Sequence, residues 1–274
     1  MLTVAAFASK LLLYGAALGA VGAATHRGIG LPSSRRLSVA LASAVAAAAA
    51  LRLVIVNAEM GGGLGAALSI DTFSWTWGSL GPQATAFLAG AGLLLAGALA
   101  GSRILAAAAA IAIAAGFGLA GHSAGLETPG IAPAVVGLHV LIAGFWFFAP
   151  VSLWPRADLS DDEVTRRTKT FSRVAVAIVP VLFLSGVWLL WRIGGGVDGV
   201  LASLYGRLLL GKLGVAGAIL GLGALNMTVV TKRLAAAPAS GRMALRATLG
   251  VEAVLFLGVL LLIASATTFT GPNE

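Results

Sequence analysis

Apolar residues are gathered into eight long runs, separated by short segments that carry most of the charges. A helix needs about 20 mostly apolar residues to cross the hydrocarbon core of a bilayer, so each run predicts one transmembrane helix. The runs cover residues 3–24, 38–57, 82–100, 102–121, 133–153, 172–191, 205–230 and 246–267. No linker divides them. We therefore expect an all-α polytopic membrane protein, a single bundle of eight transmembrane helices over residues 1–274 with no separate soluble domain.

The composition supports a lipid-embedded chain and excludes a soluble one. Apolar residues make up 59% of the chain and charged residues 10%, with a mean hydropathy of +0.99, whereas a soluble domain is about 45–50% apolar and about 25% charged. The 37 glycines are typical of membrane helices, because small residues let two backbones approach closely. The absence of cysteine excludes disulfides, thiolate metal sites and iron–sulfur clusters.

The charges between the runs predict the orientation of the bundle. We count the first run as a retained span rather than a signal peptide, because no positive charge precedes it and Lys10 lies inside it. Thirteen of the 18 basic residues lie in the odd-numbered connections: Arg27, Arg35, Arg36, Arg103, Arg156, Arg166, Arg167, Lys169, Arg173, Lys232, Arg233, Arg242 and Arg246. The positive-inside rule places these connections in the cytoplasm. We expect extracytoplasmic termini, a bacterial inner (plasma) membrane location, and no nucleic-acid partner despite the net charge of +8.

Two connections carry further signals. Residues 58–81 are rich in glycine and contain Trp75 and Trp77, and tryptophans in such a place are typical of a membrane–water interface. We therefore expect this segment to be an outer loop. In the fifth connection, Ser160 followed by Glu163 fits a capping box, which predicts a short cytoplasmic helix leading into the sixth span.

Polar side chains inside the spans are costly in lipid and indicate an interior, functional position. Those that lie toward the outer ends are Lys10, Arg52, Glu59, Met60, His122, His139 and Lys212, whereas Asn226 and Glu252 lie nearer the cytoplasm. Arg52 and Glu59 are seven residues apart, so they share a helix face and are expected to belong to one ion-paired network. The same spacing places His139 and Trp146 on one stripe of the fifth span.

Two histidines indicate a metal site near the outer face. His122 ends the fourth span and His139 lies in the fifth, so a helix hairpin would bring the two rings together. Imidazole and thioether ligands suit copper, and carboxylate is a harder companion, so Met60 or Glu59 is expected to assist. Other roles stay open: a helix-capping histidine, a packing methionine, a structural carboxylate, or a haem held by the two histidines. A ligand role for His26 at the inner end of the first span is not favoured.

Three stretches in the second half of the chain resemble the copper resistance protein D (CopD) family of bacterial inner-membrane proteins. They are LHVLIAGFWFFAPVSLWP at 138–155, FSRVAVAIVPVLFLSGVWLLWRI at 171–193 running into YGRLLLGKLGVAGAILGLGALN at 205–226, and LRATLGVEAVLFLGVLLLIASATTFTGP at 245–272. The Gly-His pair at 121–122 is also similar, and the CopD-like region covers about 121–272. The polar positions that match are His122, His139, Trp146, Lys212, Asn226 and Glu252. Phe147, Phe148 and Ala149 stand where the family commonly has a Gly-Gly pair.

The resemblance implies a protein that handles copper between periplasm and cytoplasm, beside a small periplasmic copper chaperone. We therefore expect copper transport through a histidine site, with import as the direction that the resemblance favours. The residues expected to form the accompanying polar network are Arg52, Trp146, Lys212, Asn226 and Glu252. Lys212 and Glu252 are more readily explained as interhelical partners than as proton carriers, although not as partners of each other.

Two alternatives to transport stay open. The first is a membrane copper-binding or assembly protein that passes copper to a partner without translocation. The second, less favoured, is a haem-binding redox protein. The chain contains no P-loop, GxSxG, HExxH or Rossmann fingerprint, so we do not expect an enzyme.

Overall fold

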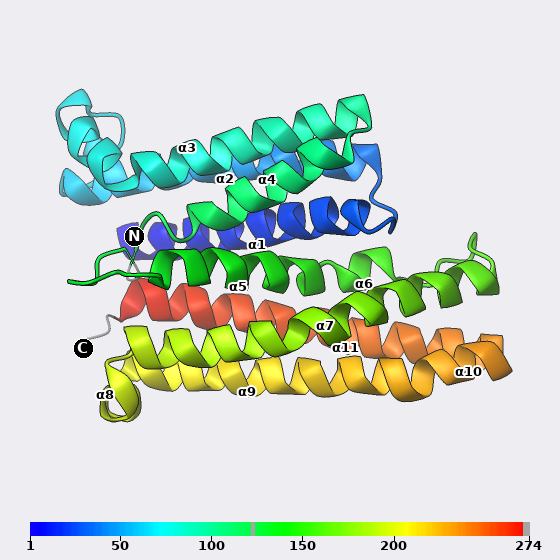
Figure 1. The fold of residues 1–274 in the computed structure, drawn as a ribbon. Helices are drawn as coiled ribbons and strands as arrows, with labels where there is room; N and C mark the ends of the chain where they lie inside the picture. The colour runs from blue at the N-terminus through cyan, green and yellow to red at the C-terminus, as the bar shows by residue number, and fades with distance from the viewer. Residues whose placement is uncertain (122–123, 271–274) are drawn as a thin grey trace.

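The computed structural model describes residues 1–121 and 124–270, and every regular element in that part of the chain is helical (Figure 1). In chain order the elements are α1 (Leu2–Gly28), α2 (Arg35–Met60), the 3₁₀ turn η1 (Leu64–Ala66), α3 (Ile70–Ala100), α4 (Arg103–Gly116), α5 (Ala132–Phe147), α6 (Ala149–Ser152), α7 (Asp161–Ile193), α8 (Gly196–Ala202), α9 (Leu204–Leu225), the π-helix η2 (Asn226–Val230), α10 (Thr231–Ala236) and α11 (Pro238–Phe269). The expected all-α class is confirmed for these residues.

Seven helical segments of the described chain are long and apolar enough to cross a membrane. They are α1, α2, α3, the α5–α6 segment, α7, the α9–η2–α10 segment and α11. The predicted span at 102–121 is shorter than expected, because α4 has only 14 residues and ends at Gly116. Its length of about 21 Å falls short of a hydrocarbon core of about 30 Å. At Gly118 the chain meets α5 so closely that a Cβ would overlap the carbonyl of Pro133.

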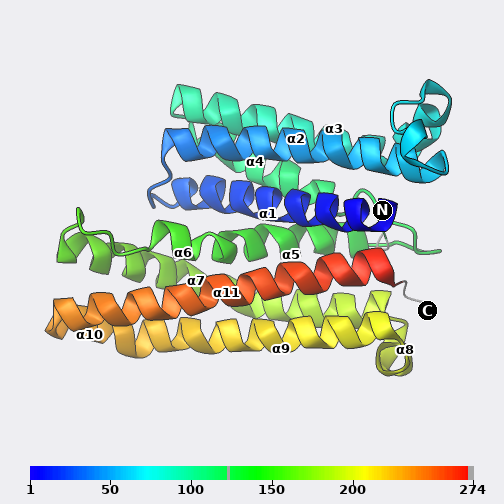
Figure 2. The same ribbon diagram turned by 180° about the vertical axis from the view of Figure 1, so that it is seen from behind.

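α1 lies at the centre of the bundle and joins two groups of helices (Figures 1 and 2). On one side it contacts α2 and α4, and on the other it contacts α5 and α11. We call α1–α4 the N-terminal region and α5–α11 the C-terminal region. The start of α1 lies beside the end of α11, where the Phe7 and Phe269 rings stack with centroids 5.5 Å apart.

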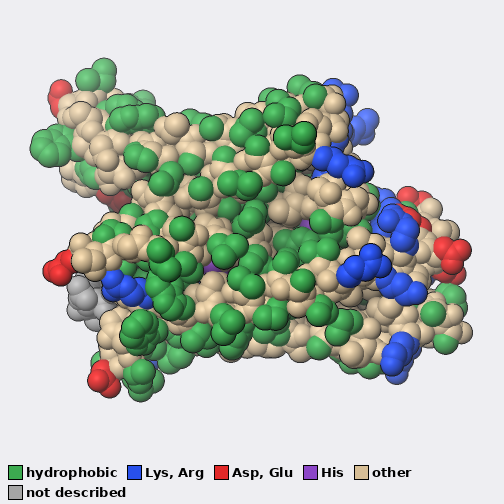
Figure 3. All heavy atoms as spheres, viewed as in Figure 1, with side chains coloured by type: hydrophobic (Ala, Val, Ile, Leu, Met, Phe, Trp, Pro, Cys, Tyr) green, Lys and Arg blue, Asp and Glu red, His purple; other side chains and the backbone are tan. Residues whose placement is uncertain are grey.

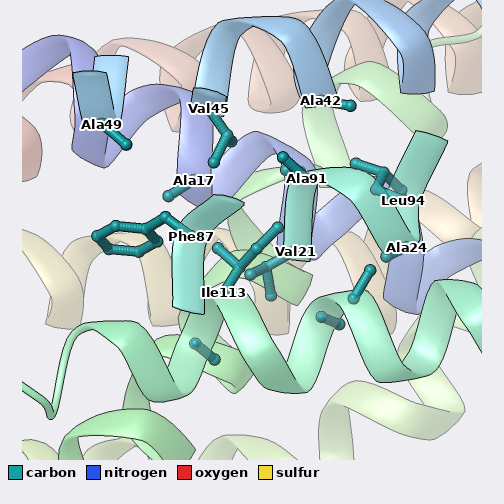
Figure 4. Packing of buried hydrophobic residues seen from close by; sticks show 14 of the residues in the cluster. Ala17, Val21, Ala24, Ala42, Val45, Ala49, Phe87, Ala91, Leu94 and Ile113 are labelled. Carbon is teal, nitrogen blue, oxygen red and sulfur yellow. The ribbon is translucent and has the colours of Figure 1, made fainter. Parts of the chain in front are cut away.

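The core of the N-terminal region consists mainly of alanine. Figure 4 shows Ala17, Ala42, Val45, Ala49 and Ala91 at the contacts between α1, α2 and α3. Small side chains allow these helices to approach closely, and van der Waals packing is a main source of helix association in lipid. The same close approach joins α3 to α4, where a Cβ at Gly90 would overlap the side chain of Ile113.

The expected outer loop at 58–81 is wrong in its second half, because α3 begins at Ile70 and carries both Trp75 and Trp77. Glycines at 78 and 81, followed by Pro82, resemble a helix boundary in the sequence, yet α3 continues through all three. Trp75 is 74% exposed, so it lies on the outside of a helix rather than in a loop.

The capping serine of the fifth connection is confirmed. Ser160 Oγ accepts a hydrogen bond from the Glu163 backbone N–H at 3.2 Å, and the helix that begins there continues without interruption to Ile193. The short cytoplasmic helix and the sixth span are therefore one element, α7. Glu163 does not reach back to close the capping box but bonds to Arg166 and Arg167.

Basic side chains gather at one end of the molecule. Figure 3 shows most of the visible Lys and Arg side chains at the end that holds the α6–α7 connection, over both groups of helices. At this end Arg242 bonds to Asp161 and to the carbonyls of Arg156 and Leu159, and Arg246 bonds to the Pro155 carbonyl. These bonds tie the start of α11 to the α6–α7 connection.

Candidate functional site

His139 is held in one orientation between α5 and α7. Its Nδ1 lies 3.0 Å from Ser185 Oγ, and the Ser185 hydroxyl in turn donates to the Leu182 carbonyl at 2.9 Å. Because that hydroxyl proton is used, Ser185 Oγ accepts from His139, so Nδ1 carries the ring proton and Nε2 keeps its lone pair. Nε2 makes no hydrogen bond of standard geometry within the described residues. A histidine whose other nitrogen is fixed in this way is typical of a metal ligand.

Two further contacts define the surroundings of His139. A Cβ at Gly186 would lie 3.1 Å from His139 Cε1, so the glycine on α7 makes room for the ring. Lys212, on α9, lies close enough to act electrostatically on the imidazole. A positive charge in this position repels a second cation, so Lys212 opposes metal binding at His139 whenever it is protonated.

The other residues of the predicted metal site have different outcomes. His122 lies outside the described residues, so its convergence with His139 stays a prediction. Met60 Sδ accepts a hydrogen bond from Thr76 Oγ1 at 3.4 Å, and Glu59 lies 3.6 Å from Arg52. The described part of the chain contains no group of three or more His, Cys, Asp or Glu side chains that could hold a metal ion.

A cationic cluster lies where α1, α2 and α11 meet. The Arg52–Glu59 ion pair expected from the sequence is present. Lys10 Nζ donates to the carbonyl of Thr267, and the Tyr14 hydroxyl lies 3.3 Å from Thr267 Oγ1. Tyr14 and Thr267 are additions that sequence spacing did not indicate, because they join the two ends of the chain.

Asn57 is a second polar residue that the sequence did not single out. Its side-chain amide donates to the carbonyls of Ala66, Ala67 and Ser69, and its oxygen accepts from Thr72 and Thr76, each at 2.9 Å. These bonds fix the turn between α2 and α3. Asn57 therefore has a structural role that explains its burial.

The most buried carboxyl group of the described chain belongs to Glu252, in the middle of α11, which is 2% exposed. Asn226 Nδ2 donates to Glu252 Oε1 at 2.9 Å, and Asn226 Oδ1 accepts from Thr248 Oγ1 at 2.5 Å. Trp146 of α5 lies close enough to act on Glu252, but its indole N–H is buried and makes no hydrogen bond of standard geometry in the described residues. We call Trp146, Asn226, Thr248 and Glu252 the Glu252 cluster.

The backbone around Asn226 is distorted. Asn226 opens the π-helix Asn226–Val230, and its carbonyl accepts a hydrogen bond from Thr231 Oγ1 at 2.8 Å. Trp146 packs against the end of α9 that leads into the π-helix, where a Cβ at Gly223 would lie 2.6 Å from Trp146 Cζ2. Single π-helical turns inside α-helices occur frequently at functional sites.

His26 has a structural role. Pro150 has no N–H to offer the carbonyl four residues before it, so the helix breaks between α5 and α6. His26 Nε2 donates to the Phe145 carbonyl at this break, at 2.7 Å. The ring is fully buried and lies against Phe145, Phe148 and Phe171. An N–H from α1 thus satisfies a carbonyl next to the break in α5.

Comparison with known proteins finds a similarity in the C-terminal region. Residues 165–266 match the family model described as copper resistance protein D. A protein named Copper resistance protein D from Pseudomonas syringae pv. tomato is 36% identical over 139 residues, which are 45% of this chain and 45% of that relative. The match thus spans less than half the length of either protein. No solved structure matches the chain.

These features define a multi-pass helical membrane protein that keeps ionisable side chains inside its bundle. The C-terminal region of the chain is similar to the copper resistance protein D family, as the three sequence stretches predicted. The matched segment contains Ser185, Lys212, Asn226 and Glu252.

Proposed function

We propose that this protein carries copper ions across the bacterial inner membrane, from the extracytoplasmic face inward. The observation that supports this best is the state of His139, whose Nδ1 is committed to Ser185 while Nε2 keeps a lone pair. A neutral imidazole in this form binds copper without first losing a proton. Similarity to the copper resistance protein D family favours copper over other metals that bind imidazole.

In this proposal His122 and His139 are the ligands, assisted by Met60 or Glu59. The ion then passes inward along the C-terminal region, past Asn226. A small number of weak ligands suits transport, because conduction requires that an ion leave its site as readily as it enters. Lys212 sets the strength of the site, since its charge opposes that of the bound ion.

The proposed topology has eight spans, with α4 as the short one, and both termini outside. It is supported by the proximity of the first and last helices at one end of the bundle and by the gathering of basic side chains at the other. The extracytoplasmic face would then receive copper from a periplasmic copper chaperone. We propose no enzymatic activity.

The test is copper analysis and copper uptake with the full chain. His122→Ala combined with His139→Ala is expected to abolish stoichiometric copper in the purified protein and uptake into proteoliposomes. Met60→Ala and Glu59→Gln, tested singly, identify the auxiliary ligand as the one that weakens binding. Met243→Ala is the control, because this methionine is 69% exposed and lies outside the proposed site. Unchanged binding and uptake in the double variant would contradict the proposal.

One observation favours a second candidate, a protein that binds copper for a partner without moving it across the membrane. The positive charge of Lys212 beside His139 opposes further entry of a cation into the bundle. Stoichiometric copper binding without uptake into proteoliposomes would establish this candidate instead. A haem absorption spectrum from the purified protein would overturn both in favour of a redox role.

A further inference from the structure

We propose that Glu252 is the proton-binding site of a copper–proton exchange cycle, in which its carboxyl group loses a proton as a copper ion enters and regains it as the ion leaves. This inference rests on the proposed function and names the ion that moves in the opposite direction. The juxtaposition that carries it is the buried carboxyl group of Glu252 on α11 next to the indole N–H of Trp146, which makes no hydrogen bond of standard geometry in the described chain. Trp146 lies on α5, the helix that also holds His139.

Glu252 lacks a compensating positive charge. The charged and titratable residues on its own helix, on the helices packed against α11 and on α5 are Lys10, Tyr14, His26, Arg27, His139, Tyr205, Arg207, Lys212, Lys232, Arg233, Arg242 and Arg246. None of the cations among them forms an ion pair with Glu252 in the described chain. A buried carboxylate without a cation is strongly disfavoured, so the group takes up a proton instead.

The neighbours of Glu252 tolerate both protonation states. Thr248 occupies the oxygen of the Asn226 side chain, which turns the amide NH₂ toward Glu252 Oε1. An N–H donor of this kind serves a neutral carbonyl oxygen and a carboxylate oxygen alike. Asn226 therefore holds the carboxyl group in position without fixing its charge, and Oε2 is left to carry the proton.

Trp146 responds to the charge. Its buried N–H has no acceptor of standard geometry in the described structure, although the side chain lies next to Glu252. An unsatisfied buried donor is unfavourable, and hydrogen bonds to charged acceptors are the stronger ones. Loss of the Glu252 proton creates such an acceptor, so the indole is expected to move onto it and to leave it when the proton returns.

The connection to copper runs along α5. His139 and Trp146 are seven residues apart on that helix, an axial separation of about 10 Å. The Glu252 carboxylate lies beyond Trp146 on α11, so its separation from a cation at His139 is at least of this order. At an intermediate dielectric, attraction over such a distance changes copper affinity by up to roughly tenfold. Copper at His139 therefore favours release of one proton from Glu252 to water, and departure of copper favours its return.

The decisive experiment measures copper and protons together in proteoliposomes. Copper(I) is supplied from a weak chelator outside, and a pH-sensitive dye is trapped inside. For the unaltered chain we expect copper uptake with loss of protons from the interior. Glu252→Gln keeps the oxygen that Asn226 contacts, so it is expected to fold, to bind copper with a weaker dependence on pH than the unaltered chain, and to give no coupled proton movement. Asp162→Asn, at an exposed carboxyl group in the first turn of α7, is the matched control.

The outcomes separate the two proposals. Absence of copper uptake by the unaltered chain contradicts the proposed function. Copper uptake without proton movement, or proton movement that persists in Glu252→Gln, overturns the role of Glu252 and leaves copper transport standing.

A second measurement needs neither copper nor transport. The emission of Trp146 is obtained as the difference between the unaltered chain and Trp146→Phe, and is followed from pH 5 to pH 9. We expect one transition, which is absent from the same difference measured in a Glu252→Gln background. A flat difference signal in the unaltered background would overturn the proposal.

Discussion

The two regions of the bundle use their interiors differently. The N-terminal region buries alanine and glycine between α1, α2, α3 and α4, whereas the C-terminal region buries Phe145, Trp146, Phe171 and large aliphatic residues around Glu252. In lipid, apolar side chains gain little by leaving the solvent, so association depends on close packing and interhelical hydrogen bonds. In both regions polar bonds cross between helices, but only in the C-terminal region does such a bond reach a buried carboxyl group. The C-terminal region is also the one that matches the copper family.

The polar residues make the same contrast. Asn57, in the N-terminal region, directs all its bonds to a turn and to two threonines on α3. Asn226, in the C-terminal region, directs its amide to an ionisable group. A buried asparagine is therefore bonded to a turn in one region and to a buried carboxyl group in the other, and only its partner distinguishes the two cases.

The largest effect is expected where the two regions meet. A Cβ at Gly22 of α1 would overlap the Gly144 carbonyl and Phe148 Cβ of the C-terminal region. Gly22→Leu should therefore separate the regions and cost about 3 kcal/mol or more, at the upper end of overpacking effects. Thermal unfolding in detergent measures this. Gly217→Leu is the control, since nothing lies within 4 Å of a Cβ there. Equal stability of the two variants would show that close packing at α1 does not hold the regions together.

A smaller effect distinguishes the two asparagines. Asn57→Ala removes five side-chain hydrogen bonds and should cost about 2–3 kcal/mol, and Asn226→Ala removes two and should cost about 1–2 kcal/mol. Only Asn226→Ala is expected to alter the pH dependence of Trp146 emission. Unfolding curves and difference fluorescence measure both quantities. A pH response changed equally by Asn57→Ala would remove the distinction between the regions.

The smallest effect concerns the start of α7, which lies outside both interiors. Ser160→Ala removes the cap on the Glu163 N–H and should cost about 1 kcal/mol. Ser160→Asp keeps an acceptor at this position and should retain the stability of the unaltered chain. The midpoint of thermal unfolding compares the three proteins. Equal loss in both variants would mean that the hydroxyl acts in some other way than as a cap.

The hydrophobic runs predicted most of the fold because apolar length is nearly sufficient to define a membrane helix. The errors arose at glycine and proline. Residues 78–82 resemble a helix start but lie inside α3, and the run at 102–121 is helical only to Gly116. The presence of a glycine alone does not predict close packing: nothing lies within 4 Å of a Cβ at Gly217 or Gly221, whereas the close crossing uses Gly22 and Gly144, on different helices.

The candidate site was predictable by residue type but not by partner. The free-energy cost of placing polar side chains in lipid singled out Glu252, Asn226 and Lys212. Helix spacing paired Arg52 with Glu59. Spacing within one helix carries no information about neighbours from distant helices. It therefore missed the bond from Asn226 to Glu252 and the influence of Lys212 on His139, which depend on how α5, α9 and α11 are arranged.

The short helix α4 has a consequence for the membrane itself. The Gly116 carbonyl at its end receives a hydrogen bond from Gln83 of α3 at 3.1 Å, so the protein rather than water satisfies that backbone group. Irregular backbone is tolerated at bilayer depth only where protein or a water-filled cavity surrounds it. Hydrophobic mismatch at such a helix is relieved by local thinning of the bilayer. In the proposed topology, an ion that approaches beside α4 from the extracytoplasmic face would cross lipid thinned in this way, so its dehydrated path would be shorter than the full thickness of the bilayer.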